Sequence, residues 1–74
     1  LLKLTIKNKN DISAVMEHID AENLTVKNVR IKDRGEDNHL LQLRILIHQK
    51  QKTTEIYYTV SSFKEISAVE IESL

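Results

Sequence analysis

Apolar and polar residues alternate along residues 39–49, the most regular pattern in the chain. A period of two predicts a β-strand with one face in a hydrophobic core. The residues on the core side are Leu41, Leu43, Ile45 and Ile47. Leu40 and Leu46 fall on the opposite face, which is otherwise polar, and we expect them to form a small apolar patch there. The pattern therefore predicts a central strand in a sheet that is covered on one side.

The N-terminal part of the chain predicts a strand followed by a helix. The strand residues on the core side are Leu2, Leu4 and Ile6. The apolar spacing then changes to i, i+3, i+4, i+7, which is typical of an amphipathic helix with one apolar stripe. The stripe consists of Ile12, Val15, Met16 and Ile19. We expect Asn10 or Asp11 to cap the start of this helix and Asn23 to end it.

The next strand is less regular, because its alternation slips by one position between Val26 and Val29. We interpret Leu24 and Val26 as packing under the end of the helix, with the paired strand over residues 28–33. A β-bulge is the alternative explanation for the slip. Residues 34–38 contain the only glycine and several turn-forming residues, so they are predicted to form a hairpin loop to the strand described above.

Residues 53–66 fit two patterns. Ile56, Val60 and Phe63 have helical spacing, whereas the surrounding β-branched and aromatic residues are typical of a strand. We favour the helix, because Glu55 would lie in its first turn, where a negative charge stabilises the helix dipole. The chain then ends in an alternating segment that predicts a short last strand. This segment contains Val69, Glu70, Ile71 and Glu72.

The predicted order of elements is strand, helix, strand, strand, helix, strand. This order is typical of a ferredoxin-like α+β sandwich, in which a four-stranded antiparallel sheet carries two helices on one face. In that arrangement the first and third strands are central. We therefore expect a single domain over residues 1–74. The residues expected to face the helices are Leu2, Leu4, Ile6, Val29, Ile31, Leu41, Leu43, Ile45, Ile47, Val69 and Ile71.

The composition narrows the classes of function. The 74 residues include no cysteine, which excludes disulfides and thiolate metal sites. The formal net charge is zero, which argues against a general nucleic-acid or anionic-membrane binder, because those proteins carry a basic excess. No apolar run approaches the roughly 18 residues of a membrane span, so we expect no direct membrane insertion by this segment. The first residue is Leu1, and we interpret the chain as a domain excised from a longer protein.

Candidate catalytic and metal-binding residues are few. His18, His39 and His48 are the candidate metal ligands, but their spread over a helix surface and two ends of a strand favours ordinary surface histidines. No nucleophile and base can be paired from their spacing, and a single glycine cannot make a phosphate-binding loop. An acylphosphatase-like enzyme is disfavoured because the first loop does not offer the phosphate cradle that this chemistry needs. We therefore expect no enzymatic activity, no catalytic residue, no metal site and no cofactor.

The polar face of the predicted sheet offers one candidate surface. Lysines of the first strand can form cross-strand ion pairs with Glu70 and Glu72 of the last strand, which explains these charges without a ligand. The central strands lack the aromatic residues on which RNA bases stack, so we expect no nucleic-acid partner. Leu40 and Leu46 remain without an internal partner. We expect them to form an interaction surface, either in a homodimer or against an attached domain or another protein.

Three segments resemble the ACT type of regulatory domain: the helix start at Asp11-Ile12, residues 24–29, and residues 63–71. The last segment is similar to the helix-to-strand ending of ACT domains. ACT domains that bind amino acids usually carry a glycine in the loop between the first strand and the first helix, whereas residues 8–10 contain none. Among ACT-like domains without that glycine, the chain is similar to the cytoplasmic C-terminal domain of the MgtC/SapB family.

This resemblance implies a non-catalytic regulatory or protein-interaction domain at the cytoplasmic face of the bacterial inner membrane. The parent protein would be a membrane protein linked to magnesium homeostasis. The partner would be the attached membrane domain, another protein or a second copy. The alternative is a soluble ACT-type sensor that binds an amino acid or a similar small ligand at Asn10 and Asp11.

Overall fold

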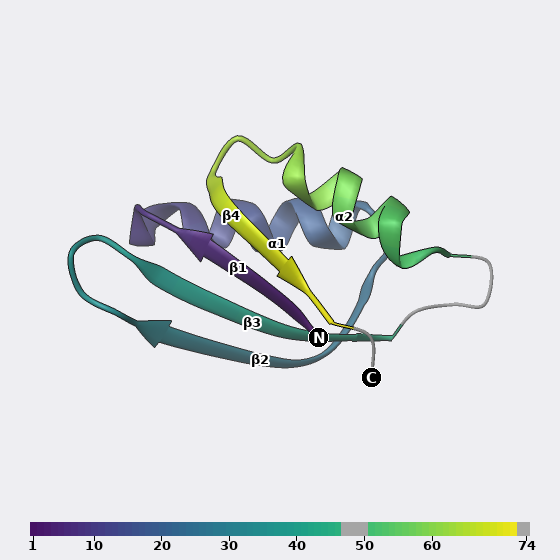
Figure 1. Ribbon diagram of the computed structural model, residues 1–74, viewed down its shortest axis with the longest axis horizontal. Coiled ribbons are helices and arrows are strands. Elements are labelled where there is room, and N and C mark those ends of the chain that lie inside the picture. Colours follow the sequence, from purple (N-terminus) through teal and green to yellow (C-terminus); the bar gives the residue numbers. More distant parts are fainter. Residues whose placement is uncertain (47–50, 73–74) are drawn as a thin grey trace.

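The computed structural model describes residues 1–46 and 51–72, and Figure 1 shows how the elements follow one another. The elements are β1 (Leu2–Ile6), the 3₁₀ turn η1 (Lys9–Asp11), α1 (Ile12–Ala21), β2 (Thr25–Asp33), β3 (His39–Leu46), α2 (Thr53–Ser61) and β4 (Ile66–Ile71). Ile47 and His48, expected to continue the third strand, lie outside the described residues.

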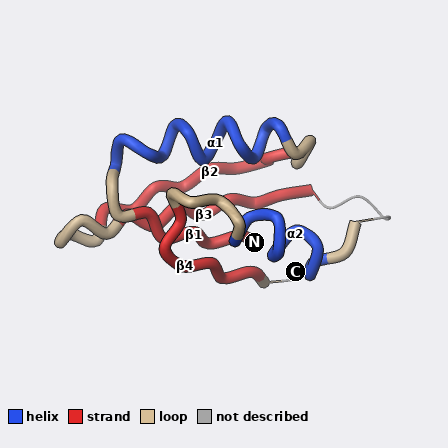
Figure 2. The backbone as a smooth tube through the Cα atoms, turned by 90° about the horizontal axis from the view of Figure 1, so that it is seen from above, coloured by secondary structure: helices blue, strands red, loops and turns tan. Residues whose placement is uncertain are grey.

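The four strands form one sheet in the order β2-β3-β1-β4, and every neighbouring pair is antiparallel. Figure 2 shows the two helices beside this sheet. The buried residues of α1 and of α2 belong to the same cluster as the inward residues of β1 and β3, so both helices cover one face. The predicted ferredoxin-like α+β fold is therefore confirmed, with β1 and β3 in the centre.

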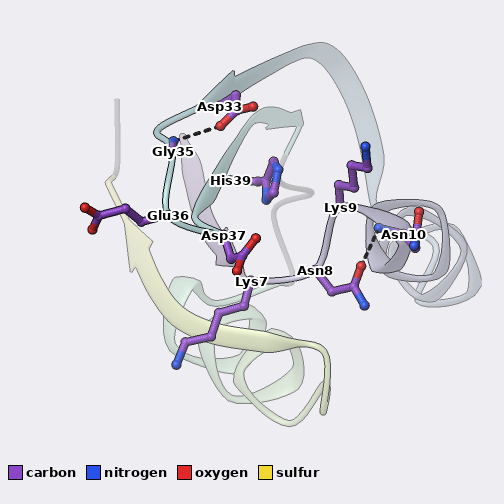
Figure 3. A pocket seen from close by; sticks show the side chains of 9 residues that line it. All are labelled: Lys7, Asn8, Lys9, Asn10, Asp33, Gly35, Glu36, Asp37 and His39. Carbon is purple, nitrogen blue, oxygen red and sulfur yellow. Dashed lines mark hydrogen bonds between the residues drawn. The ribbon is translucent and has the colours of Figure 1, made fainter.

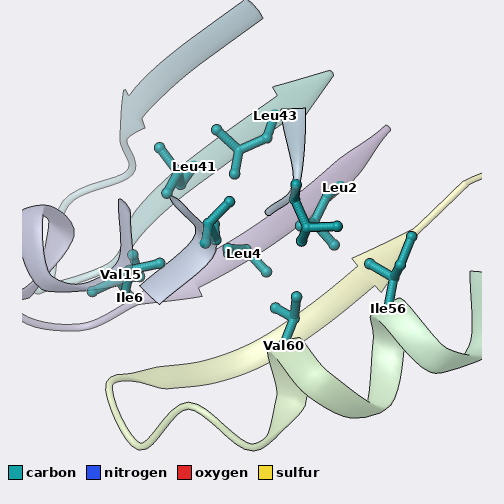
Figure 4. Packing of buried hydrophobic residues seen from close by; sticks show 10 residues of the cluster. Leu2, Leu4, Ile6, Val15, Leu41, Leu43, Ile56 and Val60 are labelled. Carbon is teal, nitrogen blue, oxygen red and sulfur yellow. The ribbon is translucent and has the colours of Figure 1, made fainter. Parts of the chain in front are cut away.

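The core lies between the central strands and the two helices (Figure 4). Every second residue of β1 and β3 contributes to it, as the alternation predicts. Its fully buried residues are Leu2, Leu4, Ile6, Val15, Ile19, Leu41, Leu43 and Val60. Partly buried residues packed against them include Ile45, Val69 and Ile71, which were also expected on this face.

Two of the residues expected in the core are not buried. Val29 and Ile31 of β2 retain 45% and 53% of their exposure. Their register is as expected, because they lie opposite Leu43 and Leu41 and therefore share the helix-covered side of the sheet. β2 is an edge strand, however, and the buried cluster extends only as far as Val26 on it. The alternation predicted the correct face but not that the helices leave this part of it open.

β2 also begins earlier than expected. It starts at Thr25, and its register with β3 shifts between Val26 and Asn28. The strand thus continues through the slip with a shifted register, which favours the alternative explanation, a β-bulge, over a strand that starts at residue 28. The accompanying expectation for packing is confirmed, because Leu24 is buried and Val26 packs against the core.

The helix boundaries differ in detail from the expected ones. Asp11 is the N-cap residue of α1, as one of the two alternatives predicted, but its side chain makes no capping hydrogen bond. The side-chain cap lies one turn earlier, at the start of η1, where Asn8 Oδ1 accepts a hydrogen bond of 2.9 Å from the backbone N–H of Asn10. Asn23 has a φ of 59°, the left-handed conformation that commonly follows a helix end. The helical interpretation of residues 53–66 is confirmed for Thr53–Ser61, with Glu55 in the first turn.

Candidate functional site

A depression on the surface lies between the β1–α1 loop and the β2–β3 hairpin (Figure 3). These segments meet because β1 and β2 are both antiparallel to β3 and therefore end on the same side of the sheet, at the ends of the strands. The depression has a volume of about 690 Å³. Its lining residues are Lys7, Asn8, Lys9, Asn10, Asp33, Gly35, Glu36, Asp37 and His39.

Hydrogen bonds of the backbone and of the Asp33 side chain hold the hairpin side of the depression in place. The N–H of Arg34 donates to the carbonyl oxygen of Asn38 at 2.9 Å, and the N–H of Gly35 donates to Asp33 Oδ1 at 2.8 Å. Gly35, Glu36 and Asp37 all have positive φ. This conformation costs nothing special at the glycine but about 1–2 kcal/mol at each of the other two residues. The turn is therefore a strained segment fixed by its own hydrogen bonds.

The lining carries both signs of charge. Lys7 and Lys9 come from the β1–α1 loop, and Asp33, Glu36 and Asp37 come from the hairpin. Pockets for small molecules are usually lined mainly by apolar residues, whereas the residues that line this one are polar or charged apart from Gly35. A lining with both lysines and carboxylates can bind a small polar molecule that carries both an ammonium and a carboxylate group.

His39 connects the two sides of the depression. Its Nδ1 lies 3.3 Å from the carbonyl oxygen of Ile6, where the ring N–H donates to that oxygen. Asn10, one of the two expected ligand residues, lines the depression, and Asp11 does not. The hairpin residues were missed in the sequence analysis. The signal that could have revealed them is topological, since the only glycine-containing turn follows a strand parallel to β1.

No group of three or more histidine, aspartate or glutamate residues among residues 1–46 and 51–72 could hold a metal ion. His18 and His39 lie on different elements and have different partners. The third candidate, His48, lies outside the described residues. Within the same ranges, no helix is long and apolar enough to cross a membrane.

His18 fastens α1 to the segment that precedes β4. Its Nε2 lies 3.4 Å from Glu65 Oε2, and its ring packs against that of Phe63 with centroids 5.0 Å apart. The pKa of the Glu65 carboxyl is lowered, first by its own backbone N–H and then by the imidazole of His18, although partial burial opposes this. Glu65 Oε1 is buried without a hydrogen-bond partner. The pair ties α1 to the turn between α2 and β4, and neither residue lines the depression.

The open face of the sheet holds the two leucines expected to form an apolar patch. Leu40 is almost completely buried, at 6% exposure, whereas Leu46 retains 46%. Leu40 borders a shallow hollow of about 220 Å³ whose lining includes Lys3 and Arg34. The expected exposed pair is therefore corrected to a single exposed leucine, Leu46.

The ion pairs expected across β1 and β4 centre on one lysine. Lys3 Nζ lies 3.3 Å from Glu70 Oε2 and 3.5 Å from Glu72 Oε1, and these carboxylates raise the pKa of Lys3. Two acidic residues thus share a single cation. On the other side of the same face, Arg30, Lys32 and Arg44 make no ion pair with any described residue.

Comparison with known proteins finds similar sequences and folds. The chain is 20% identical over 74 residues to Protein SapB of Bacillus subtilis, covering 99% of this chain and 32% of SapB. It therefore spans about a third of the length of this curated relative. Its fold matches the solution structure of the C-terminal domain of the MgtC protein from Mycobacterium tuberculosis with a TM-score of 0.69 at 17% identity, over 93% of this chain and 79% of that one. No family model matches the chain. The expected resemblance to MgtC and SapB is confirmed.

Proposed function

We propose that this chain is the C-terminal regulatory or protein-interaction domain of a bacterial membrane protein linked to magnesium homeostasis. The observation that carries this proposal is the shared fold with the MgtC C-terminal domain, together with similarity to SapB along nearly the whole chain. The remaining two-thirds of a SapB-like protein would supply the membrane part. The domain would then lie at the cytoplasmic face of the inner membrane.

In this role the domain acts by contact rather than by bond chemistry. Leu46 supports a contact on the open face, because it is a large apolar side chain that stays half exposed at the end of a central strand. Leu40 lies on the same face but is buried, and it lines a hollow there together with polar residues. The partner in the proposal is the attached membrane domain or another protein.

The test uses the full-length parent protein in its own membrane. A photo-crosslinking residue replaces Leu46, and a matched control places it at Tyr58, which is also exposed and apolar but lies on α2. We expect a specific crosslink from position 46, to the membrane part or to a second protein, and none from position 58. Equal labelling from both positions, or none from position 46, would contradict the proposed contact surface.

The second candidate function is a small-ligand sensor of the ACT type. It is favoured by one observation, the depression beside Asn10 with its mixed charges. Titration of the 74-residue chain with amino acids and with Mg²⁺, followed by amide NMR shifts, separates the two candidates. Saturable shifts confined to Asn10, Asp11 and the facing hairpin would favour the sensor. An unchanged spectrum together with a crosslink at Leu46 would favour the interaction domain.

A further inference from the structure

The sheet has two open edges, and they carry complementary side chains. β2 and β4 are the outermost strands, so each pairs with a neighbour on one side only. The outer N–H and C=O groups of an edge strand are a template for another strand. We propose that copies of this chain associate head to tail, with the β2 edge of one copy pairing with the β4 edge of the next.

The β2 edge is apolar on one face and basic on the other. Val29 and Ile31 lie on the helix-covered side of the sheet but remain about half exposed. Arg30 lies opposite Gln42, which separates the core-facing Leu41 and Leu43, and Arg30 therefore points to the open face together with Lys32. Neither cation forms an ion pair with a described residue.

The β4 edge has the same apolar pattern with the opposite charge. Val69 and Ile71 lie on the helix-covered side, where they pack against the core. Glu70 and Glu72 lie on the open face and share Lys3 as their only described cation, which leaves one negative charge in excess. The alternation extends one residue past the strand, because the backbone N–H of Glu72 donates to the Leu1 carbonyl oxygen at 2.8 Å.

The strand directions allow this pairing without turning one copy over. β2, β3, β1 and β4 alternate in direction, so the two edge strands run in opposite senses. A second copy displaced sideways in the plane of the sheet therefore presents β4 antiparallel to β2, with its helices on the same side. In the register that places Arg30 opposite Glu70, Val29 faces Ile71 and Ile31 faces Val69. Apolar pairs and an ion pair then form on opposite faces of one ladder.

Symmetric pairing is disfavoured by the same residues. If two copies joined through β2 with Val29 opposite Ile31 of the second copy, Arg30 would face its own equivalent. Two β4 strands would similarly bring glutamates together. Like charges directly opposite one another destabilise a strand pair, and basic residues on an edge commonly serve to prevent such pairing. The head-to-tail contact is heterologous, so it forms an open chain of copies rather than a closed dimer.

Sedimentation velocity of the 74-residue chain tests the proposal with two double variants. We expect weak, concentration-dependent association at low ionic strength that high salt reverses. Arg30→Glu/Lys32→Glu and Glu70→Lys/Glu72→Lys should each weaken association by about tenfold or more. Their equimolar mixture should restore it, because each reversed edge then meets its complement. The control Lys9→Glu/Lys52→Glu makes the same change in net charge as the first double variant at residues outside β2 and β4, and it should associate as the parent chain does.

Three results would overturn the proposal. They are a wild-type chain that stays monomeric up to about 1 mM at low salt, a mixture that does not recover association, and a control that loses it equally. Thermal unfolding establishes that each variant is folded. An independent measurement avoids substitution altogether: on dilution of the wild-type chain, amide NMR shifts should change along both β2 and β4. Changes along β2 alone would instead mean a symmetric contact and would also overturn the head-to-tail arrangement.

Discussion

Ile31 lies directly opposite Leu41 in the ladder between β2 and β3, yet Ile31 is 53% exposed and Leu41 is 0% exposed. The two residues share one face of the sheet and occupy the same cross-strand pair. They differ only in what covers them, because the helices pack over the central strands and leave the middle of the edge strand open. Strand pairing therefore fixes which side a residue faces, and the packing of the next layer fixes whether it is buried.

This difference predicts unequal costs for the same kind of truncation. Leu41→Ala should lower the free energy of unfolding by about 2–5 kcal/mol, because it leaves a cavity in a packed core. Ile31→Ala should cost about 1 kcal/mol or less, since its side chain is already half in water. Urea unfolding of the two variants measures both values. Equal costs would show that the edge strand is covered in solution.

A charge at the centre of β3 should prevent folding. Leu43 is fully buried between the sheet and the helices, and Leu43→Arg would bury a cation without a partner. The matched control is Leu46→Arg on the same strand, where the side chain is half exposed and points to the open face. Circular dichroism melting should show a cooperative transition for the control only. A native-like melt of Leu43→Arg would contradict the assigned core.

The stability of the fold should depend on the Asn8 side chain, which caps η1, and much less on the Asn10 side chain. Asn8→Ala removes the side-chain acceptor for the Asn10 N–H and should cost about 1 kcal/mol of stability. Asn10→Ala keeps the backbone donor and removes a side chain that is not the cap, so its effect should stay within about 0.5 kcal/mol. Chemical denaturation of both variants checks the assignment. The reverse order would return the cap to Asn10.

At Gly35 the hairpin turn has space for a methyl group, but its backbone conformation favours glycine. Nothing lies within 4 Å of a Cβ added at Gly35, but the φ of this residue is +75°. Gly35→Ala should therefore cost about 1–2 kcal/mol through backbone strain alone. Gly35→Asn should cost less, because asparagine adopts positive φ more readily. Thermal denaturation distinguishes strain from crowding, since crowding would make the larger asparagine worse.

The lowered pKa of Glu65 should make the stability of the fold depend on pH on the acidic side. The pKa of Glu65 is lowered on folding below its ordinary value of 4.5, first by its backbone N–H and then by His18. A carboxyl shifted in this direction stabilises the fold above its unfolded pKa, and this contribution is lost as the pH falls through the folded pKa.

Denaturation of the wild type and Glu65→Gln at a series of pH values measures this contribution. The wild type should be the more stable of the two near neutral pH, and the difference should shrink as the pH falls below about 4.5. Glu17→Gln on the exposed side of α1 serves as the control. A difference that stays constant with pH would remove Glu65 as its source.

The sequence was sufficient for the fold because the alternation in β1 and β3 and the helical stripe of α1 each reflect local geometry. It was sufficient even for α2, where Glu55 in the first turn decided between two patterns. It could not predict the exposure of Val29 and Ile31, because no local pattern records how far a helix reaches across a sheet.

The candidate site was less predictable for a similar reason. Leu40 lies opposite Thr5 of β1 and Lys32 of β2 and borders a hollow that Lys3 also lines, so its burial depends on residues outside its own strand. The depression beside Asn10 is completed by a hairpin that follows a different strand. Such juxtapositions arise from topology, so residue types and spacing indicate one side of the site and not the other.

The backbone of Leu1 and that of Glu72 are hydrogen-bonded in both directions, at 2.8 Å each. The start of β1 and the end of β4 are therefore side by side in the sheet. Tension applied between these two points would open the β1–β4 ladder one bond at a time, like a zipper, instead of shearing many bonds together. A domain held in this way is mechanically soft between its two ends, whatever the thermodynamic stability of its core.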